Sequence, residues 1–458
     1  IEQLFTRQFQ QASEAFIKAN LSNEWQQLQQ QCLSQLQQLA LSSDYAWRVL
    51  CQFPQVFWQM QQQGLLNQPL ARPYYHQQIP ELLPLRFSDF TWMQSIRQYR
   101  QQMMLRWIYR DVNQLSSLAE LTDELSEFAE ACVDAAIAYT EQVLITRYGQ
   151  PIGEDSGQIQ KMIVIGMGKL GAQELNLSSD IDLIFSYPEA GETNGRSVIS
   201  NQEYFIKLSQ QVIRLLDQQT GDGFVFRIDM RLRPWGDGSA LALSFNAMER
   251  YYEQHGREWE RYAFIKARVI AGDIAAGQEL LSSLRPFVYR RYIDYSAFAA
   301  LRDMKAMIER EVRRKDMADN IKLGAGGIRE VEFIAQAFQL IRGGVFKDLQ
   351  QRPLLPVLSV LVERQLLSVQ AAQELASAYQ FLRQVEHRIQ CYNDQQTQKL
   401  PSDEFARLRL AKSLGFADYA AFLDVLEAHR CHVSKHFQDV VENPQSKEQR
   451  SVSQLARE

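Results

Sequence analysis

Cysteine is scarce in this sequence, and the spacing of the few cysteines excludes two common kinds of site. The 458 residues contain five cysteines, and no two of them form a Cys-x-x-Cys pair. Disulfide frameworks and thiolate zinc sites depend on closely and regularly spaced cysteines. We therefore expect reduced thiols, no thiolate metal site and a cytoplasmic location.

Long hydrophobic runs and a strong excess of positive charge are also missing. No apolar run approaches the roughly 20 residues that a helix needs to cross a bilayer, and the amino terminus lacks a secretory pattern. The formal net charge is -5, which argues against bulk nucleic-acid binding. With 458 residues, of which 46% are hydrophobic, the chain can bury substantial cores, and its length predicts two to four domains.

Helical spacing dominates the first quarter of the chain. Residues 1 to about 115 are rich in Gln, Leu and aromatic residues, with apolar positions such as Phe9, Ala12, Phe16 and Ile17 at helical intervals. The Gln-rich segment 26–38 carries a further apolar stripe, made of Leu28, Cys32, Leu36 and Leu39. Glutamine is a fair helix former, so we interpret this segment as a packed helix and not as a low-complexity tract.

The most informative stretch joins a glycine turn to a pair of acids. A short apolar strand at 162–165 leads into Gly166-Met167-Gly168-Lys169, and Asp180-Ile181-Asp182-Leu183 follows. In an extended strand Asp180 and Asp182 project to one side, while the apolar residues project to the other. Two carboxylates this close favour a hard divalent cation, for which we expect Mg²⁺, and the glycines let backbone amides approach a phosphate. A surface turn with two solvated aspartates is the alternative.

A third acid stands in a segment whose residues alternate in polarity. In 223–234, Phe224, Phe226, Ile228 and Met230 alternate with Val225, Arg227, Asp229 and Arg231, as in a half-buried strand. If this strand lies beside the one that carries the acid pair, three acids converge on one or two metals. Arg231 or Arg233 could then neutralise phosphate charge, although a surface strand with salt bridges is the alternative.

The order of these elements resembles the nucleotidyltransferase superfamily that includes DNA polymerase β. In that superfamily a Gly-Ser or Gly-Gly usually precedes the acid pair, whereas Gly168-Lys169 stands there in this chain. The longer string from Gly166 to Leu183, with Arg231-Leu232-Arg233-Pro234-Trp235-Gly236, resembles the bacterial glutamine synthetase adenylyltransferase family. Further strings similar to that family lie at 259–268, 324–333 and 382–388, so the resemblance spans about residues 120 to 400.

The resemblance implies an activity. The family's bifunctional enzyme resembles two fused halves, of which the first removes AMP from glutamine synthetase by phosphorolysis and the second adds AMP from ATP. The string 174–179 is more similar to the first half. The implied reaction is therefore attack of inorganic phosphate on an adenylylated tyrosine of glutamine synthetase, with release of ADP. The family is controlled by the PII signal protein, whose uridylylated form favours removal.

The resemblance also implies roles for individual residues. Asp180, Asp182 and Asp229 are the catalytic residues and the ligands of Mg²⁺. The residues expected to contact the nucleotide and the phosphate groups are Gly168, Lys169, Ser179, Arg231 and Arg233. Two alternatives stay open: adenylylation of glutamine synthetase from ATP, and a regulatory module that binds a nucleotide or PII without catalysis.

Together the patterns and the resemblance predict an α+β fold. A polymerase β-like nucleotidyltransferase domain with a small mixed sheet is expected at 116–300. Helical domains are expected at 1–115 and 301–441, and a polar linker tail at 442–458. Within them we expect a long helix from Leu118 to Thr146, a crossover helix at 202–218, and helices at 298–314, 328–341 and 354–392.

Two further groups of residues could bind ligands. Gly324-Ala325-Gly326-Gly327 precedes a helix, so its amides could hold an anion, or it could be a tight turn between domains. His429, Cys431, His432 and His436 have a helical spacing that could form a metal site, although helical histidines more often cap or pack.

Overall fold

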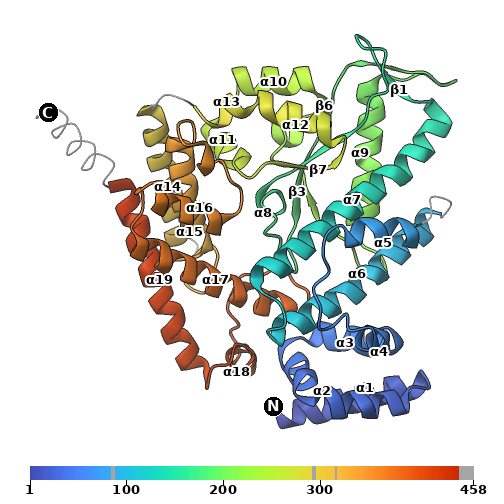
Figure 1. Cartoon of the computed structure of the whole chain (residues 1–458), viewed down its shortest axis with the longest axis vertical. Coiled ribbons are helices and arrows are strands. Elements are labelled where there is room, and N and C mark those ends of the chain that lie inside the picture. The colour runs from blue at the N-terminus through green and yellow to red at the C-terminus, as the bar shows by residue number, and fades with distance from the viewer. Residues whose placement is uncertain (84–87, 291–294, 315–316, 443–458) are drawn as a thin grey trace, which may run out of the picture. The chain divides into compact units, whose positions relative to one another are not determined.

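A computed structural model describes residues 1–83, 88–290, 295–314 and 317–442 (Figure 1). The chain forms two compact units. The first unit contains Ile1–Phe287 and the short segment Gln390–Gln396, and the second contains Val288–Ile389 and the described residues from Thr397 onward. The predicted limit between 115 and 116 lies within the first unit, because helices on both sides of it share one hydrophobic core. The domain limits that we expected from the sequence stay a prediction.

The amino-terminal part is helical, as its spacing predicts. The helices are α1 (Glu2–Lys18), α2 (Ser22–Ser42), α3 (Asp44–Gln52), α4 (Pro54–Gln62), α5 (Tyr74–Leu82) and α6 (Asp89–Val112). Side-chain caps begin two of them: the Ser43 hydroxyl accepts from the amide of Ala46, and the Ser88 hydroxyl accepts from that of Thr91.

The apolar stripes of the first two helices agree only in part with the expectation. In α2 the predicted stripe of Leu28, Cys32, Leu36 and Leu39 is buried. In α1 the buried row is Leu4, Gln8, Ala12 and Phe16, and Phe9 is partly buried against the same core. Ile17 is 57% exposed, contrary to the prediction, because it follows Phe16 and is therefore turned about 100° away from that row.

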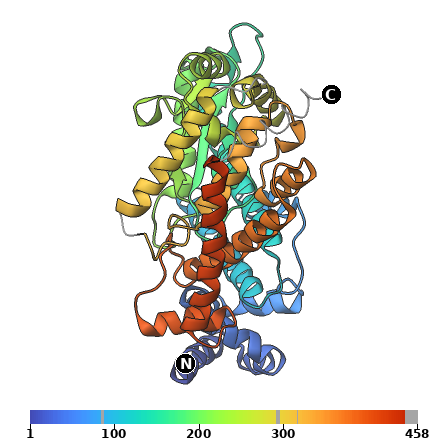
Figure 2. The ribbon, with the colours of Figure 1, turned by 90° about the vertical axis from the view of Figure 1, so that its left-hand side faces the viewer.

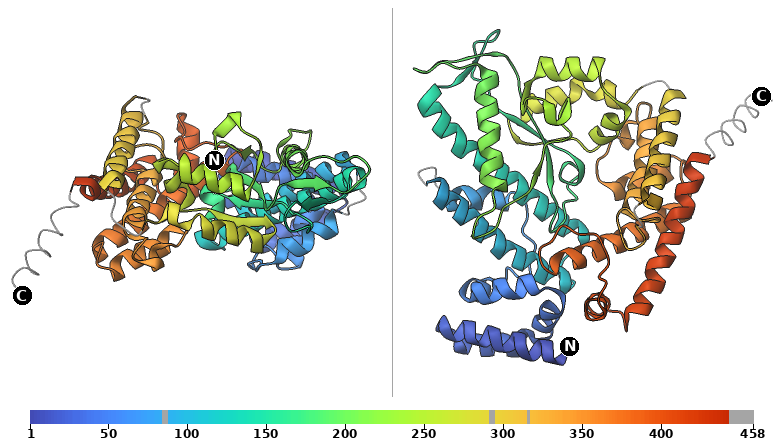
Figure 3. Two further views of the ribbon diagram at one scale, coloured as in Figure 1. Left: turned by 90° about the horizontal axis from the view of Figure 1, so that it is seen from above. Right: turned by 180° about the vertical axis from the view of Figure 1, so that it is seen from behind.

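A long helix connects the amino-terminal helices to the sheet. Helix α7 (Leu118–Tyr148) begins where the Ser117 hydroxyl caps the amide of Glu120, and it confirms the long helix expected in this region. It packs against α5, against α9 (Asn201–Asp217) and against β7 (Arg268–Gly272). Figure 3 shows these elements beside one another from behind.

The sheet is small and mixed, as the resemblance implies. Its strands are β2 (Ile163–Gly166), β3 (Ile181–Tyr187), β5 (Ile228–Asp229), β6 (Ala242–Ser244) and β7, in the order β5-β3-β2-β7, with β6 also on β3. Strand β2 pairs antiparallel with β3 and β7, whereas β5 and β6 pair parallel with β3. A separate ribbon joins β1 (Pro151–Gly153) to β4 (Gly191–Thr193).

Several of the helices in this part of the chain contact the sheet. This part contains the short α8 (Gly168–Gly171), α9, α10 (Phe245–Gln254), α11 (Glu258–Phe264), α12 (Ile274–Ser283) and α13 (Arg285–Val288). Helix α9 is the predicted crossover helix, and its predicted inward residues Phe205, Leu208, Val212 and Leu215 are all fully buried. It contacts β3, β5 and β6 and thereby supports the strands that carry the acids.

The segment 223–234 is mostly not a strand, contrary to the prediction. Only Ile228 and Asp229 pair with a neighbouring strand. Val225 and Phe226 are both buried, and both of their amides donate to the carbonyl of Leu216, so the backbone there turns and does not extend. The alternation of apolar and polar residues in this segment therefore belongs to a loop that folds onto the end of α9, and not to a strand.

The second unit is helical. Its helices are α14 (Tyr295–Arg314), α15 (Ile328–Arg342), α16 (Leu354–Glu363), α17 (Val369–Cys391), α18 (Glu404–Ser413) and α19 (Tyr419–Glu442), of which α19 packs along α15 (Figure 2). The predicted tail at 442–458 lies outside the described residues from 443 onward. In the described part of the chain, no helix has the length and apolar character needed to cross a membrane.

The single helix expected over 354–392 is wrong. Helix α16 stops at Glu363 because Gln365 adopts a left-handed conformation with φ of 55°. The amides of Gln365 and Leu366 donate to the carbonyls of Val362 and Leu361, which is the hydrogen-bond pattern that ends many helices. No disulfide joins any of the five cysteines, all of which lie in the described part of the chain.

A buried carboxylate ties α6 and α7 together and allows a stability test. Glu124 accepts hydrogen bonds from Arg106, from the indole of Trp107 at 3.0 Å and from the amide of Leu70 at 2.9 Å. Glu124→Gln keeps the shape but replaces one acceptor oxygen by a donor and leaves the buried Arg106 cation unpaired. We expect the free energy of unfolding to fall by about 3–5 kcal/mol in urea denaturation. The exposed Glu279→Gln on α12 is the control, and an equal effect in both variants would contradict the prediction.

Candidate active site

The turn after β2 brings a glycine close to the second acid. The amide of Met167 donates to the carbonyl of Asp182 at 2.9 Å, and Gly168 follows with φ of 53°. A Cβ atom at Gly168 would lie 2.9 Å from Oδ2 of Asp182. Only glycine adopts this conformation at low cost and leaves room for the carboxylate.

The second and third acids lie side by side. In the parallel pairing of β3 with β5, Asp182 stands directly opposite Asp229, one step after Ile181 opposite Ile228. Laterally paired residues of neighbouring strands project to the same face of a sheet. The two carboxylates therefore share one face, at the edge where the short strand β5 ends the sheet.

The first acid precedes β3 and is held by two donors. Arg227 donates from Nε to Oδ1 of Asp180 at 2.6 Å, and Gln396 donates from Nε2 to Oδ2 at 2.6 Å. Arg227 also donates from Nη2 to the carbonyl of Ser178 at 3.0 Å. The Asp180 side chain is 29% exposed, so solvent and ligands can reach it.

The third acid is paired with an arginine from its own loop. Arg231 donates from Nε to Oδ2 of Asp229 at 2.8 Å, and its backbone amide donates to Oδ1 at 2.8 Å. This arginine holds the pKa of Asp229 below its usual value. The Arg231 side chain is 75% exposed, so it can turn from the carboxylate toward an anion in solvent.

The other predicted residues lie in different surroundings. The Ser179 hydroxyl accepts from the amide of Asn176 at 3.3 Å, and Lys169 lies on α8 directly after Gly168. Arg233 is 7% exposed and donates to the carbonyl of Met230 at 2.7 Å, so it braces its own loop. The structure thus sets Arg231, but not Arg233, in contact with solvent at this edge.

The donor chemistry of this edge fits Mg²⁺, which prefers carboxylate oxygens and water. Asp182 and Asp229 share a face, and the missing side chain of Gly168 leaves space at Asp182. Within the described ranges, however, no three His, Cys, Asp or Glu side chains are already grouped as a metal site. Arg227 and Arg231 occupy carboxylate oxygens there, so a cation would compete with these two guanidinium groups.

Two side chains at this edge were not assigned a role from the sequence. Arg227 belongs to the alternating segment, so its place near the acids could be anticipated, but its contact with Asp180 could not. Gln396 stands far from Asp180 in the chain, and no motif marks it. A single sequence carries no signal for such a contact.

The glycine turn of the second unit is a tight turn that is closed by a carboxylate. The amide of Gly326 donates to Oε2 of Glu330 at 3.0 Å, and that of Gly327 donates to the carbonyl of Gly324 at 3.0 Å. A side chain of the protein therefore takes the place in which an anion could bind. Glu330 is buried, and this burial raises its pKa to about 7.

The histidines of α19 are used for packing and pairing. The ring of His429 stacks on Phe381 with centroids 4.8 Å apart, and His436 contacts Glu374 at 2.6 Å. In the part of the chain that the structure describes, these histidines belong to no group of three metal-ligating side chains.

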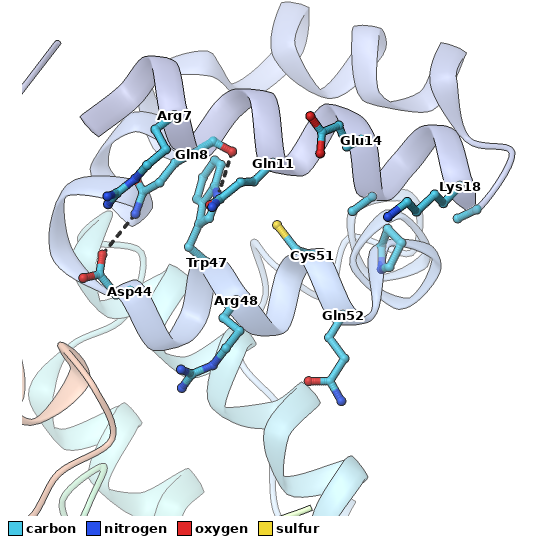
Figure 4. A pocket seen from close by; sticks show the side chains of 13 residues that line it. Arg7, Gln8, Gln11, Glu14, Lys18, Asp44, Trp47, Arg48, Cys51 and Gln52 are labelled. Carbon is cyan, nitrogen blue, oxygen red and sulfur yellow. Dashed lines mark hydrogen bonds between the residues drawn. The ribbon is translucent and has the colours of Figure 1, made fainter. Parts of the chain in front are cut away.

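A polar hollow of about 800 Å³ lies between α1 and α3 (Figure 4). Gln8 donates to Asp44 at 3.0 Å at one side of it, and Arg48 and Lys18 also line it. None of the predicted site residues lines this hollow. The acids at the sheet edge are therefore the stronger candidate site, because their carboxylate oxygens can bind a divalent cation.

Comparison with known proteins identifies relatives. A family model described as glutamate-ammonia ligase adenylyltransferase matches residues 33–283, and one described as GlnD PII-uridylyltransferase matches residues 302–441. A protein of Acinetobacter baylyi named bifunctional glutamine synthetase adenylyltransferase/adenylyl-removing enzyme is 53% identical over 408 residues, which are 89% of this chain and 44% of that protein.

Relatives with the same name occur in other bacteria. The protein of Pseudomonas syringae pv. tomato is 50% identical over 88% of this chain and 41% of its own length. That of Pseudomonas aeruginosa is 49% identical over 91% of this chain and 42% of its own length. The chain thus spans less than half the length of these relatives.

The tight approach at Gly168 leads to a test with a matched control. Gly168→Ala adds a methyl group against the Asp182 carboxylate in a left-handed conformation, which costs about 1–2 kcal/mol for a residue with a Cβ atom. We expect this loss of stability together with weaker binding of Mn²⁺, a spectroscopic substitute for Mg²⁺, in a titration. Gly157 has φ of 65° and no atom within 4 Å of a Cβ atom, so Gly157→Ala should lose stability alone. Unchanged Mn²⁺ binding in Gly168→Ala would contradict the prediction.

The buried Glu330 predicts a pH-dependent stability. Its folded-state pKa of about 7 lies above the ordinary value of 4.5, so the folded chain binds this proton more tightly than the unfolded chain does. The resulting stability is fully present below about pH 4.5 and is lost as the pH rises through about 7. Urea denaturation should show Glu330→Gln gaining stability relative to the wild type across this range, by at most about 1.4 kcal/mol per pH unit. A difference that does not change with pH would argue against it.

Proposed function

Because this chain belongs to the glutamate-ammonia ligase adenylyltransferase family, we propose that it is a nucleotidyltransferase that acts on glutamine synthetase. In this proposal it removes AMP from an adenylylated tyrosine by Mg²⁺-dependent phosphorolysis. The phosphorus–oxygen bond to the tyrosine side chain breaks, and a bond to an oxygen of hydrogen phosphate forms. ADP leaves, and the tyrosine oxygen of glutamine synthetase takes up the proton that the attacking phosphate loses. Removal of AMP would reactivate glutamine synthetase.

The observation that carries the proposal is the pairing of Asp182 with Asp229 on neighbouring parallel strands. Two like charges at one edge repel each other, and a binding-only site has no need of them. With Asp180 just before β3, they offer the oxygen ligands that a phosphoryl-transfer site requires.

The residues of the chain supply position and charge. Asp180, Asp182 and Asp229 would hold Mg²⁺, which when bound neutralises charge on the reacting phosphate groups. The attacking phosphate arrives as an anion, so Asp229 is not needed as a general base. Arg231 is exposed and can leave Asp229 for a phosphate oxygen, with which it forms charge-assisted hydrogen bonds. The amide of Gly168 and the side chain of Lys169 would contact the phosphate groups from the turn.

The choice between removal and addition of AMP depends on one short string of residues. The string 174–179 is more similar to the adenylyl-removing half of the family, and this favours removal. Addition of AMP from ATP is the second candidate, since it would use the same three acids. The match of residues 302–441 to a family model named for a PII-uridylyltransferase supports the proposal that the PII protein controls the activity, with the uridylylated form favouring removal.

One assay separates these reactions. The chain is incubated with adenylylated glutamine synthetase, Mg²⁺ and inorganic phosphate, and ADP is measured. We expect release of ADP that requires phosphate and that falls at least about 100-fold in Asp182→Asn, since losing a direct ligand should cost no less than losing an outer partner. Asp155→Asn removes an exposed carboxylate from a turn and should keep the wild-type rate.

The products decide between the candidates. Pyrophosphate release from ATP with unmodified glutamine synthetase, without ADP release, would establish the opposite reaction. Neither product, in the presence or absence of uridylylated PII, would favour the regulatory module.

A further inference from the structure

A short segment of the chain belongs to the first unit although its neighbours on both sides belong to the second. Residues Gln390–Gln396 group with the first unit, whereas the residues up to Ile389 and from Thr397 onward do not. A stretch this short cannot form a core of its own, so specific contacts must hold it in place.

Hydrogen bonds that involve the backbone anchor the start of this segment. The amide of Ser178, two residues before Asp180, donates to Oε1 of Gln390 at 3.2 Å. The amide of Tyr45 on α3 donates to the carbonyl of Tyr392 at 3.1 Å, and the hydroxyl of Ser43 donates to that of Cys391. The segment thus joins α3 to the loop that carries the first acid.

A buried ion pair anchors its middle. Arg100 on α6 donates to both oxygens of Asp394, at 2.9 and 3.2 Å, and both side chains are less than a tenth exposed. The same guanidinium lies 5.0 Å from the ring centroid of Phe224, and that of Arg227 lies 4.8 Å from it. Cation–π contacts of this kind link the two arginines through one ring.

These contacts close a ring around Asp180. The order is Asp394, Arg100, Phe224, Arg227 and Asp180, and Gln396 returns from Asp180 to the segment. Each of the two Asp180 oxygens receives one hydrogen bond of 2.6 Å. Each oxygen keeps a further lone pair, so the carboxylate is oriented without losing its capacity to bind a cation.

We propose that Gln396 is a positioning residue that orients the Asp180 carboxylate for the cation, and that the Asp394–Arg100 pair holds Gln396 in reach. This rests on the proposed function, in which Asp180 is a cation ligand. A neutral amide suits this task, because it fixes the carboxylate without cancelling the negative charge that attracts the cation. Arg227 fixes the other oxygen but opposes the cation with its own charge.

The test replaces the amide donor by an isosteric side chain. Gln396→Met removes the hydrogen bond to Asp180, whereas Gln395→Met makes the same change at the exposed neighbouring position. Loss of an outer partner of a metal ligand typically weakens metal binding or activity 10- to 100-fold. In a Mn²⁺ titration we expect Gln396→Met to bind about 10-fold more weakly than Gln395→Met.

A second measurement needs neither metal nor substrate. Hydrogen exchange of residues 176–182 in the metal-free chain should be faster in Gln396→Met than in Gln395→Met, because the loop before β3 loses one of its attachments. Equal Mn²⁺ affinity and equal exchange in the two variants would overturn the positioning role and leave the proposed function intact. Mn²⁺ binding that survives Asp182→Asn would instead overturn the proposed cation site, and the exchange comparison would still decide the role of Gln396.

Discussion

The parallel pairing of β3 with β5 is the constraint on which the site depends. It sets Asp182 beside Asp229 at one sheet edge, and Asp180 directly precedes the strand that carries Asp182. Like charges at this distance raise the free energy of the folded chain unless cations neutralise them. In this structure the guanidinium groups of Arg227 and Arg231 neutralise Asp180 and Asp229. A divalent cation would compete with these two groups for the carboxylate oxygens.

The rest of the first unit keeps that edge in place. Helix α9 packs its fully buried apolar face on β3 and β5, while α7 packs on α9 and β7. The strand β5 itself has only two residues, too few to hold its register through backbone hydrogen bonds alone. Its position therefore depends on the loop before it, where Val225 and Phe226 are anchored to the carbonyl of Leu216 at the end of α9.

Local patterns in the sequence predicted those parts of the fold that depend on local interactions. The stripe of α2, the crossover helix α9 and the short apolar strand β2 follow from spacing that a helix or strand must show when one face is buried. The expected strand over 223–234 and the expected helix over 354–392 were wrong for the same reason. Alternation and apolar spacing do not reveal a loop folded onto a helix, or one residue, Gln365, that takes a left-handed conformation.

The sequence by itself determined which residues could do chemistry: a glycine turn, an acid pair on an apolar strand, a third acid among arginines, and the similarity of these strings to one enzyme family. Only the tertiary structure decided which arginine faces which acid, that Arg233 is buried, and that Gln396 reaches Asp180. The physical reason is distance along the chain. Spacing along a strand or helix constrains neighbours within a few residues, whereas a hydrogen bond between residues 180 and 396 exists only after the core that joins their elements has formed.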